Sequence, residues 1–181
     1  TGKVTIHSIP SKIKQLEVSY GIEWREYSVS DLFEIKSTLS FNKDSLTNGH
    51  DYDYVTRTSQ NQGVLQTTGF VNEENINSAK TWSLGLLQMD FFYRSKPWYA
   101  GQFVRKIIPK FEVSEKVALY FTVLLNKKKA SLLSVLVRDV DSTFLNMKLT
   151  LPVNGSDICF EYIIDFIDFI KLGPIEKVKS Y

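Results

Sequence analysis

The most constraining feature of this 181-residue sequence is a pair of long polar stretches, residues 37–52 and 57–82, that lack sustained apolar periodicity. Loops of this length are uncommon inside a compact domain, and loops carried on a rigid scaffold are frequent sites of function. Apolar residues still make up 43% of the chain, which is enough for a buried core at this length. We therefore expect one domain, with at most a short appendage, whose polar loops carry the function.

Short strands are expected through most of the chain and helices mainly toward its end. The strands are expected at 24–28, 33–36, 53–56, 84–89 and 91–93, within 101–109, and at 147–153. Helices are expected at 11–20, after the N-cap residue Ser114, at 130–137, and from Ser156 or Asp157 to the stop signal Gly173-Pro174. The predicted class is α+β, with one small, twisted, mostly antiparallel sheet, long polar loops and C-terminal helices.

The sequence contains none of the common catalytic or metal-binding patterns. Two histidines, His7 and His50, and one cysteine, Cys159, are too few for the usual zinc sites. Nucleophile-elbow, phosphate-loop and dinucleotide-binding motifs do not occur. We therefore predict a non-catalytic binding module with no metal and no cofactor of its own.

The polar loop after the strand at 53–56 has the chemistry of a DNA-reading surface. It consists of Arg57, Thr58, Ser59, Gln60, Asn61 and Gln62. Arginine can bond guanine with two hydrogen bonds, asparagine or glutamine can do the same with adenine, and hydroxyls suit phosphates. The alternative is an ordinary polar loop whose side chains bond within their own turns.

A second segment interleaves cations with aromatic residues. Arg94 and Lys96 lie close in sequence to Trp98 and Tyr99, a mixture that suits phosphate contact with base stacking. Lys43 and Arg138 are further candidates for DNA backbone contacts. The alternative is that the aromatics are core residues. The net charge of +2 is too small to indicate nucleic-acid binding by itself.

Four segments, in this order, resemble the target-recognition domain of restriction–modification specificity (S) subunits of type I, and more closely of type IIB and IIG systems. They are residues 24–36 (WREYSVSDLFEIK), 53–59 (DYVTRTS), 97–104 (PWYAGQFV) and 138–146 (RDVDSTFLN), the last followed by LTLP at 149–152. On this resemblance, residues 1–23 are an N-terminal lead-in, 24–158 the DNA target-recognition domain, and 159–181 the start of a spacer helix with a tail.

The resemblance implies sequence-specific recognition of one half of a double-stranded DNA target. Its partners would be a methyltransferase subunit, which binds S-adenosylmethionine and methylates adenine, and an endonuclease subunit. One recognition domain instead of two implies a fragment or a half-subunit that pairs with a second domain or a second copy. A recognition part of a fused methyltransferase–nuclease is another possibility.

A cytoplasmic protein without a membrane span is expected, because no apolar run approaches the length of a span and a single cysteine forms no internal disulfide. The alternative function is a protein- or carbohydrate-interaction domain with an aromatic surface of Trp98, Tyr99 and Phe70, and nearly salt-independent binding.

Overall fold

The structure is a computed structural model that describes residues 8–179. The chain divides into two compact units. The terminal unit combines the two ends of the chain, up to residue 27 and from residue 149, and the inserted unit comprises residues 28–148. None of the helices in the described part is both long and apolar enough to cross a membrane.

The described part of the terminal unit contains two helices and a three-stranded sheet of order β1-β9-β10. Its elements are α1 (Ser8–Ser19), β1 (Glu23–Ser28), β9 (Lys148–Asn154), β10 (Asp157–Ile158) and α6 (Phe160–Lys179). Asn154-Gly155 forms a tight turn between β9 and β10, with Gly155 at φ 65°. Asp157 thus belongs to a strand instead of capping a helix, and α6 continues through the expected stop at Gly173-Pro174.

The centre of the inserted unit is a four-stranded antiparallel sheet of order β2-β8-β5-β6. Its strands are β2 (Phe33–Ser37), β8 (Val104–Pro109), β5 (Thr81–Gly85) and β6 (Phe91–Arg94). Helix α3 (Glu115–Asn126) is joined to this sheet by a 2.8 Å hydrogen bond from Trp82 Nε1 to Thr122. Phe33 packs edge-on against Trp82 and Phe121, so an aromatic cluster joins sheet and helix.

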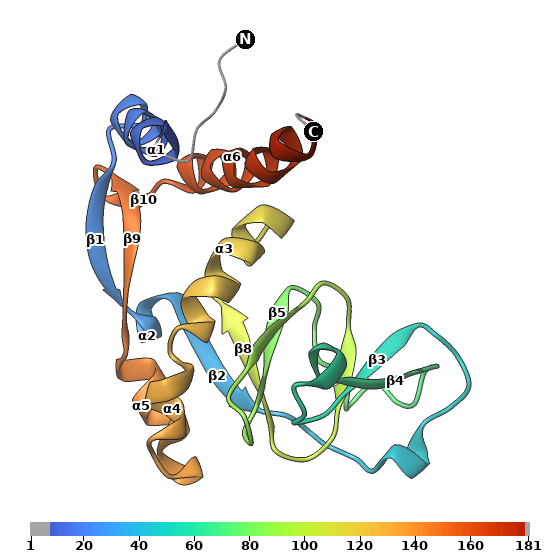
Figure 1. Cartoon of the computed structure of the whole chain (residues 1–181). Helices are drawn as coiled ribbons and strands as arrows, with labels where there is room; N and C mark the ends of the chain where they lie inside the picture. The colour runs from blue at the N-terminus through green and yellow to red at the C-terminus, as the bar shows by residue number, and fades with distance from the viewer. Residues whose placement is uncertain (1–7, 180–181) are drawn as a thin grey trace. The chain divides into compact units, whose positions relative to one another are not determined.

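Short helices flank this sheet in the inserted unit. They are α2 (Val29–Leu32), α4 (Lys129–Leu133), the 3₁₀ turn η3 (Val137–Asp139) and α5 (Val140–Asn146). In Figure 1, α4 and α5 lie at the end of this unit away from β3 and β4.

A second three-stranded sheet in the inserted unit has the order β4-β3-β7. Its elements are β3 (Tyr52–Val55), β4 (Val64–Thr68) and β7 (Trp98–Ala100), with 3₁₀ turns η1 (Lys43–Ser45) and η2 (Gln60–Gly63) beside it. Strands β3 and β4 are antiparallel, and β3 and β7 are parallel. Buried Val55, Trp98, Ala100 and Val104 form one cluster that links this sheet to the start of β8.

The α+β class and the predominance of antiparallel pairing are confirmed, and so is the cap of α3, where Ser114 accepts a hydrogen bond from the Val117 N–H. The strands form three sheets within the described residues instead of one. β4 and β7 were not expected. The strand expected at 84–89 lies earlier in the chain, since β5 ends at Gly85 and a turn with Met89 at φ 58° follows. The helix expected at 130–137 is the shorter α4.

Candidate nucleic-acid interface

The polar loop between β3 and β4 is closed and sharply turned. Its ends are joined by a 2.8 Å hydrogen bond from the Thr56 N–H to the Gly63 carbonyl. Asn61, Gln62 and Gly63 have φ values of 47°, 53° and 81° in succession, all left-handed. Left-handed backbone costs energy in residues other than glycine and persists where the surroundings impose it. The loop is therefore built to hold one shape.

The guanidinium of a buried arginine and the carboxylate of an aspartate hold this loop in place. Arg94 is 5% exposed; its Nε donates to the Ser83 hydroxyl at 3.0 Å and its Nη2 donates to the Gln62 carbonyl. The Ser59 hydroxyl donates to one oxygen of Asp90, and Lys129 Nζ lies 2.7 Å from the other. The loop is thus tied to β5, β6 and α4.

Burial lowers the pKa of Arg94 to about 10, opposed by the negative charge of Asp53. The guanidinium therefore keeps its proton at neutral pH. Charged donors make stronger hydrogen bonds than neutral ones, so the bond to the Gln62 carbonyl is a firm anchor.

Arg94 and Tyr99 were both predicted to contact DNA, and the structure corrects both predictions. Tyr99 has no exposed surface. Its hydroxyl accepts a hydrogen bond from the Val71 N–H at 3.0 Å and donates one to the Asn72 carbonyl at 2.9 Å. The reason in both cases is burial: Arg94 supports the polar loop, and Tyr99 anchors the stretch around residues 71–72.

Several other predicted loop residues use their side chains inside the loop. The Thr58 hydroxyl accepts from the Gln60 N–H at 3.2 Å, the Asn61 amide donates to the Val64 carbonyl at 3.2 Å, and Ser59 bonds Asp90. This is the internal turn bonding considered as the alternative for the whole loop. It applies to these three residues, whereas Arg57, Gln60 and Gln62 are exposed.

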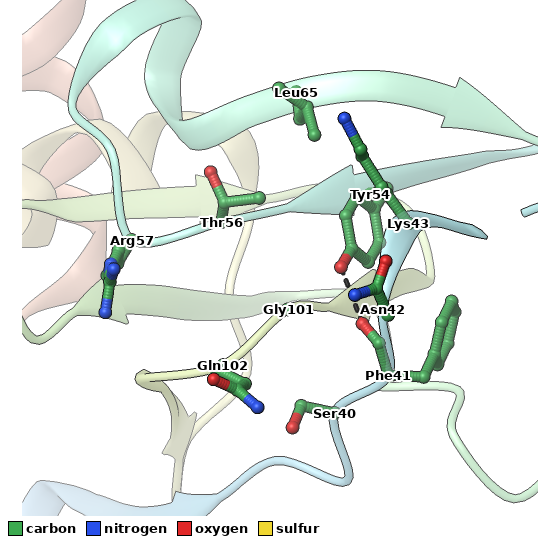
Figure 2. Close-up of a pocket in the computed structure, with 10 residues that line it drawn as sticks. All are labelled: Ser40, Phe41, Asn42, Lys43, Tyr54, Thr56, Arg57, Leu65, Gly101 and Gln102. Atoms are coloured by element: carbon green, nitrogen blue, oxygen red, sulfur yellow. Dashed lines mark hydrogen bonds between the residues drawn. The ribbon is translucent and has the colours of Figure 1, made fainter. Parts of the chain in front are cut away.

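Arg57 and Lys43 line one hollow of about 360 Å³, although they are far apart in the sequence. Figure 2 shows them on opposite sides, with Leu65 along one rim and Gln102 and Ser40 along the other. The Tyr54 hydroxyl donates to the Phe41 carbonyl at 2.6 Å across the floor. A Cβ added to Gly101 would lie 2.9 Å from that hydroxyl oxygen, so the floor requires a glycine there.

Arg57 is fixed at both its main chain and its side chain. A Cβ on Gly85 would lie 2.7 Å from the Arg57 carbonyl oxygen, so β5 packs directly against the Arg57 main chain. The guanidinium carbon lies 5.0 Å from the centre of the Phe103 ring, which is cation–π geometry. Phe103 is 51% exposed and has a φ of 61°.

Sequence reasoning did not identify Gln102, Phe103 or Gly85 as parts of this site. Gln102 and Phe103 lie inside the segment 97–104 used for the family resemblance, but nothing local distinguishes them from ordinary loop residues. Their role depends on β3 and β7 pairing in parallel, which places the end of β7 beside the Arg57 loop.

Lys96 and Arg138 have different surroundings. Lys96 is partly exposed and its Nζ lies 3.4 Å from the Asp53 carboxylate, near the β3 end of the site. Arg138 belongs to η3, between α4 and α5, where its Nε lies 3.9 Å from the Asp139 carboxylate. Arg138 is not among the residues that line the hollow, and its DNA contact stays a prediction.

The aromatic surface required by the alternative function is not formed. Trp98 and Tyr99 have no exposed surface, and Trp98 Nε1 donates to the Thr81 hydroxyl at 3.1 Å. Phe70 alone of the three proposed aromatics is exposed, at 58%. Among the residues that the structure describes, no three His, Cys, Asp or Glu side chains are grouped so that they could hold a metal ion.

The α+β fold and the exposed polar loop, with Arg57 and Lys43 beside one hollow, have the chemistry of a nucleic-acid-binding module. The family model for the type I restriction modification DNA specificity domain matches residues 21–171, and the chain belongs to this family. The assignment confirms the predicted resemblance to type I specificity subunits and the prediction of a non-catalytic DNA-specificity domain. No curated protein matches the sequence.

Solved structures share the fold at low sequence identity. The S subunit of a type I restriction–modification system from M. genitalium has a TM-score of 0.57 and 16% identity, over 97% of this chain and 46% of that one. The HsdS subunit from Thermoanaerobacter tengcongensis has a TM-score of 0.53 and 11% identity, over 90% and 45% of the two chains.

A third similar chain comes from a structure describing complex assembly and conformational transition of the type I system. It has a TM-score of 0.58 and 11% identity, over 94% of this chain and 48% of that one. This chain thus spans less than half the length of each of these three chains.

Proposed function

We propose that the inserted unit reads duplex DNA through the polar loop at 57–62 and the adjoining hollow. One observation supports this most: Arg57, Gln60, Gln62 and Lys43 are exposed together, on a backbone that buried contacts hold in one shape. None of these four side chains makes a hydrogen bond to another described residue. Exposed side chains with unused donors and acceptors, carried on a fixed backbone, are suited to recognition of base edges.

The residue types assign different roles within this surface. Arg57 is suited to the two acceptors of guanine, and Gln60 and Gln62 to adenine. Lys43 and Lys96 are suited to phosphates, which position the duplex without reading its sequence. Ser59, Thr58 and Asn61 act by holding the loop.

The domain boundaries predicted from the sequence follow the same scheme. We propose that the recognition domain predicted at 24–158 performs its DNA reading within residues 28–148. Helix α6 then corresponds to the predicted start of a spacer helix at 159–181. The lead-in predicted at 1–23 contains α1, and residues 1–7 lie outside the described part.

The partners and cofactor of the whole assembly are also proposals, because this chain spans under half of the similar S subunits. We propose that the domain acts in the cytoplasm, with a second recognition domain or a second copy, and directs a methyltransferase subunit and an endonuclease subunit to the target. S-adenosylmethionine would be bound by the methyltransferase, and this chain itself would need no cofactor.

The decisive experiment is selection from a random duplex library with the 181-residue chain, alone and with a methyltransferase subunit from the same source. We expect an enriched motif of about three to five base pairs, as one half of a bipartite site requires. Affinity for it should fall steeply between about 50 and 200 mM salt, since phosphate contacts release counterions. Absence of both enrichment and salt-dependent binding, with the partner present, would refute the proposal.

Two substitutions test the division of roles. Arg57→Ala should cost about 1–3 kcal/mol on the selected duplex and relax the preference at one position, whereas Lys43→Ala should weaken all duplexes alike and reduce the salt slope. Arg138→Ala is the matched control, because Arg138 is an exposed cation outside the lining of the hollow. Equal effects of all three substitutions would contradict the assignment.

A further inference from the structure

Phe103 is an exposed aromatic residue held in an unfavourable backbone conformation beside the proposed base reader. It is 51% exposed with a φ of 61°. Left-handed φ is rare for a bulky residue, and such outliers cluster at functional sites. Burial of apolar surface does not explain why a phenylalanine occupies this position, because about half of the residue's surface remains in solvent.

The neighbours of Phe103 fix its main chain. The Leu86 N–H donates to the Phe103 carbonyl at 2.9 Å, so the turn after β5 holds the main chain. The next residue, Val104, is 1% exposed and belongs to the buried cluster at the start of β8. The ring is therefore carried on a fixed backbone instead of a free loop tip.

The contact that the ring makes is with the Arg57 guanidinium, whose carbon lies 5.0 Å from the ring centre. No carboxylate pairs with this guanidinium among the described residues. A guanidinium over an aromatic face is held by the ring while its N–H groups stay free in the guanidinium plane. A carboxylate bound to this guanidinium would instead occupy its N–H donors. The arrangement restricts the direction of Arg57 and leaves its hydrogen bonds available.

We infer that Phe103 is a positioning residue for sequence recognition: it holds the Arg57 guanidinium in the orientation that bonds a guanine edge. The inference rests on the proposed function. It predicts that the Phe103 ring contributes to the choice of base at one position of the target through Arg57, and contributes little to general DNA affinity.

The experiment measures binding of the full chain to its selected duplex and to duplexes in which each guanine is replaced in turn. Phe103→Ala should lower discrimination at the Arg57 position by about 2- to 5-fold, as loss of an exposed cation–π contact implies. Binding to a non-selected duplex should not change. Phe103→Tyr should restore discrimination, because it keeps the aromatic face. Phe70→Ala is the matched control, an equally exposed aromatic outside this contact.

The double variant Arg57→Ala/Phe103→Ala separates positioning from a direct DNA contact by the ring. If Phe103 acts through Arg57, the double variant matches Arg57→Ala alone. Additive losses overturn the inference, and so does an equal loss on every duplex. Phe103→Gly is the second variant should alanine disturb the turn, because glycine accepts a left-handed φ without strain.

An NMR measurement distinguishes failure of this inference from failure of the proposed function. The Arg57 Nε–H resonance should be shifted by the ring current in the wild-type chain, and the shift should vanish in Phe103→Ala. A wild-type chain that shows this shift but selects no motif refutes the proposed function, and the DNA role of Phe103 with it. A wild-type chain that loses its motif in Arg57→Ala but keeps it in Phe103→Ala refutes this inference alone.

Discussion

The buried guanidinium of Arg94 donates a hydrogen bond to the main-chain carbonyl of Gln62, in the strained half of the polar loop. The two residues are 32 positions apart in the sequence. A cation buried inside the inserted unit thus sets the path of a loop on the surface of that unit. In the sequence, this positive charge resembles a DNA contact. In the structure, it instead supports the proposed recognition surface from inside the unit.

Arg94→Met should therefore destabilise the inserted unit and weaken its DNA binding together. The expected loss is about 2–3 kcal/mol of unfolding free energy, because charged hydrogen bonds to Ser83 and to the Gln62 carbonyl disappear from a buried site. Urea unfolding measures it. Arg138→Met, at an exposed position, should change stability by less than about 0.5 kcal/mol. Equal, small effects of the two substitutions would show that Arg94 does not anchor the loop.

Asp90→Asn should loosen the loop without unfolding the unit. The neutral amide keeps the volume of the side chain but removes the ion pair with Lys129, whose Nζ lies 2.7 Å away, and weakens the bond from Ser59. The site is partly exposed, so the expected cost is only about 1 kcal/mol. Hydrogen exchange of the amides at 57–62 should accelerate, while exchange in α3 stays as in the wild type. Unchanged exchange at 57–62 would contradict the tether.

Gly85→Ala should displace Arg57 through steric contact alone. The added Cβ would lie 2.7 Å from the Arg57 carbonyl oxygen, and overpacking of this kind costs about 1–3 kcal/mol. Both the base preference and the free energy of unfolding should therefore change. Gly155→Ala provides the contrast, because its Cβ meets nothing within 4 Å but its φ is 65°. That variant should lose about 1 kcal/mol of stability and keep its DNA preference. Retention of the full preference by Gly85→Ala would refute the packing argument.

The terminal unit should lose stability between about pH 10 and pH 12. The hydrogen bond that Tyr20 donates to Asp165, with a smaller effect of burial, raises the pKa of Tyr20 to about 12. Burial, with the charge of Glu17, raises that of Tyr162 to about 12. Both hydroxyls keep their protons more tightly in the folded than in the unfolded chain. The stabilisation is complete below the unfolded pKa of 10 and is lost as pH rises toward 12.

An alkaline titration followed by tyrosinate absorbance and circular dichroism measures this loss. Tyr20→Phe should flatten the stability profile between pH 10 and 12, because one of the two titrating groups is gone. Tyr27→Phe is the control, at a partly exposed tyrosine of the same unit. An unaltered profile in Tyr20→Phe would contradict the assignment to the Asp165 contact.

The parts of the fold that follow from local signals could be predicted from the sequence. The strand at 23–28 and the cap at Ser114 depend on neighbours within a few residues. The strand β4 was missed because Leu65 and Gln66 both face solvent, so it shows no alternation of apolar and polar residues. β7 was missed because all three of its residues are buried, which leaves no period to detect.

The candidate site also has parts that could be predicted from the sequence and parts that could not. Arg57 and Lys43 could be proposed from residue type, since exposed cations in polar loops are chemically recognisable. The burial of Arg94 could not, because its partners Ser83 and Gln62 lie on other elements. Phe103 matters only through its contact with Arg57, which depends on how β3, β5 and β7 are assembled.

The inserted unit begins and ends at neighbouring points. The Val29 N–H donates to the Met147 carbonyl at 2.8 Å, and Lys148 Nζ lies 2.5 Å from the Ser28 hydroxyl. β1 and β9, which lead into and out of the unit, are neighbouring strands of one sheet. A different module with equally close ends would fit the same two strands as an interchangeable cassette. On the proposed function, new specificities would arise by transplantation of residues 28–148, with the terminal unit left unaltered.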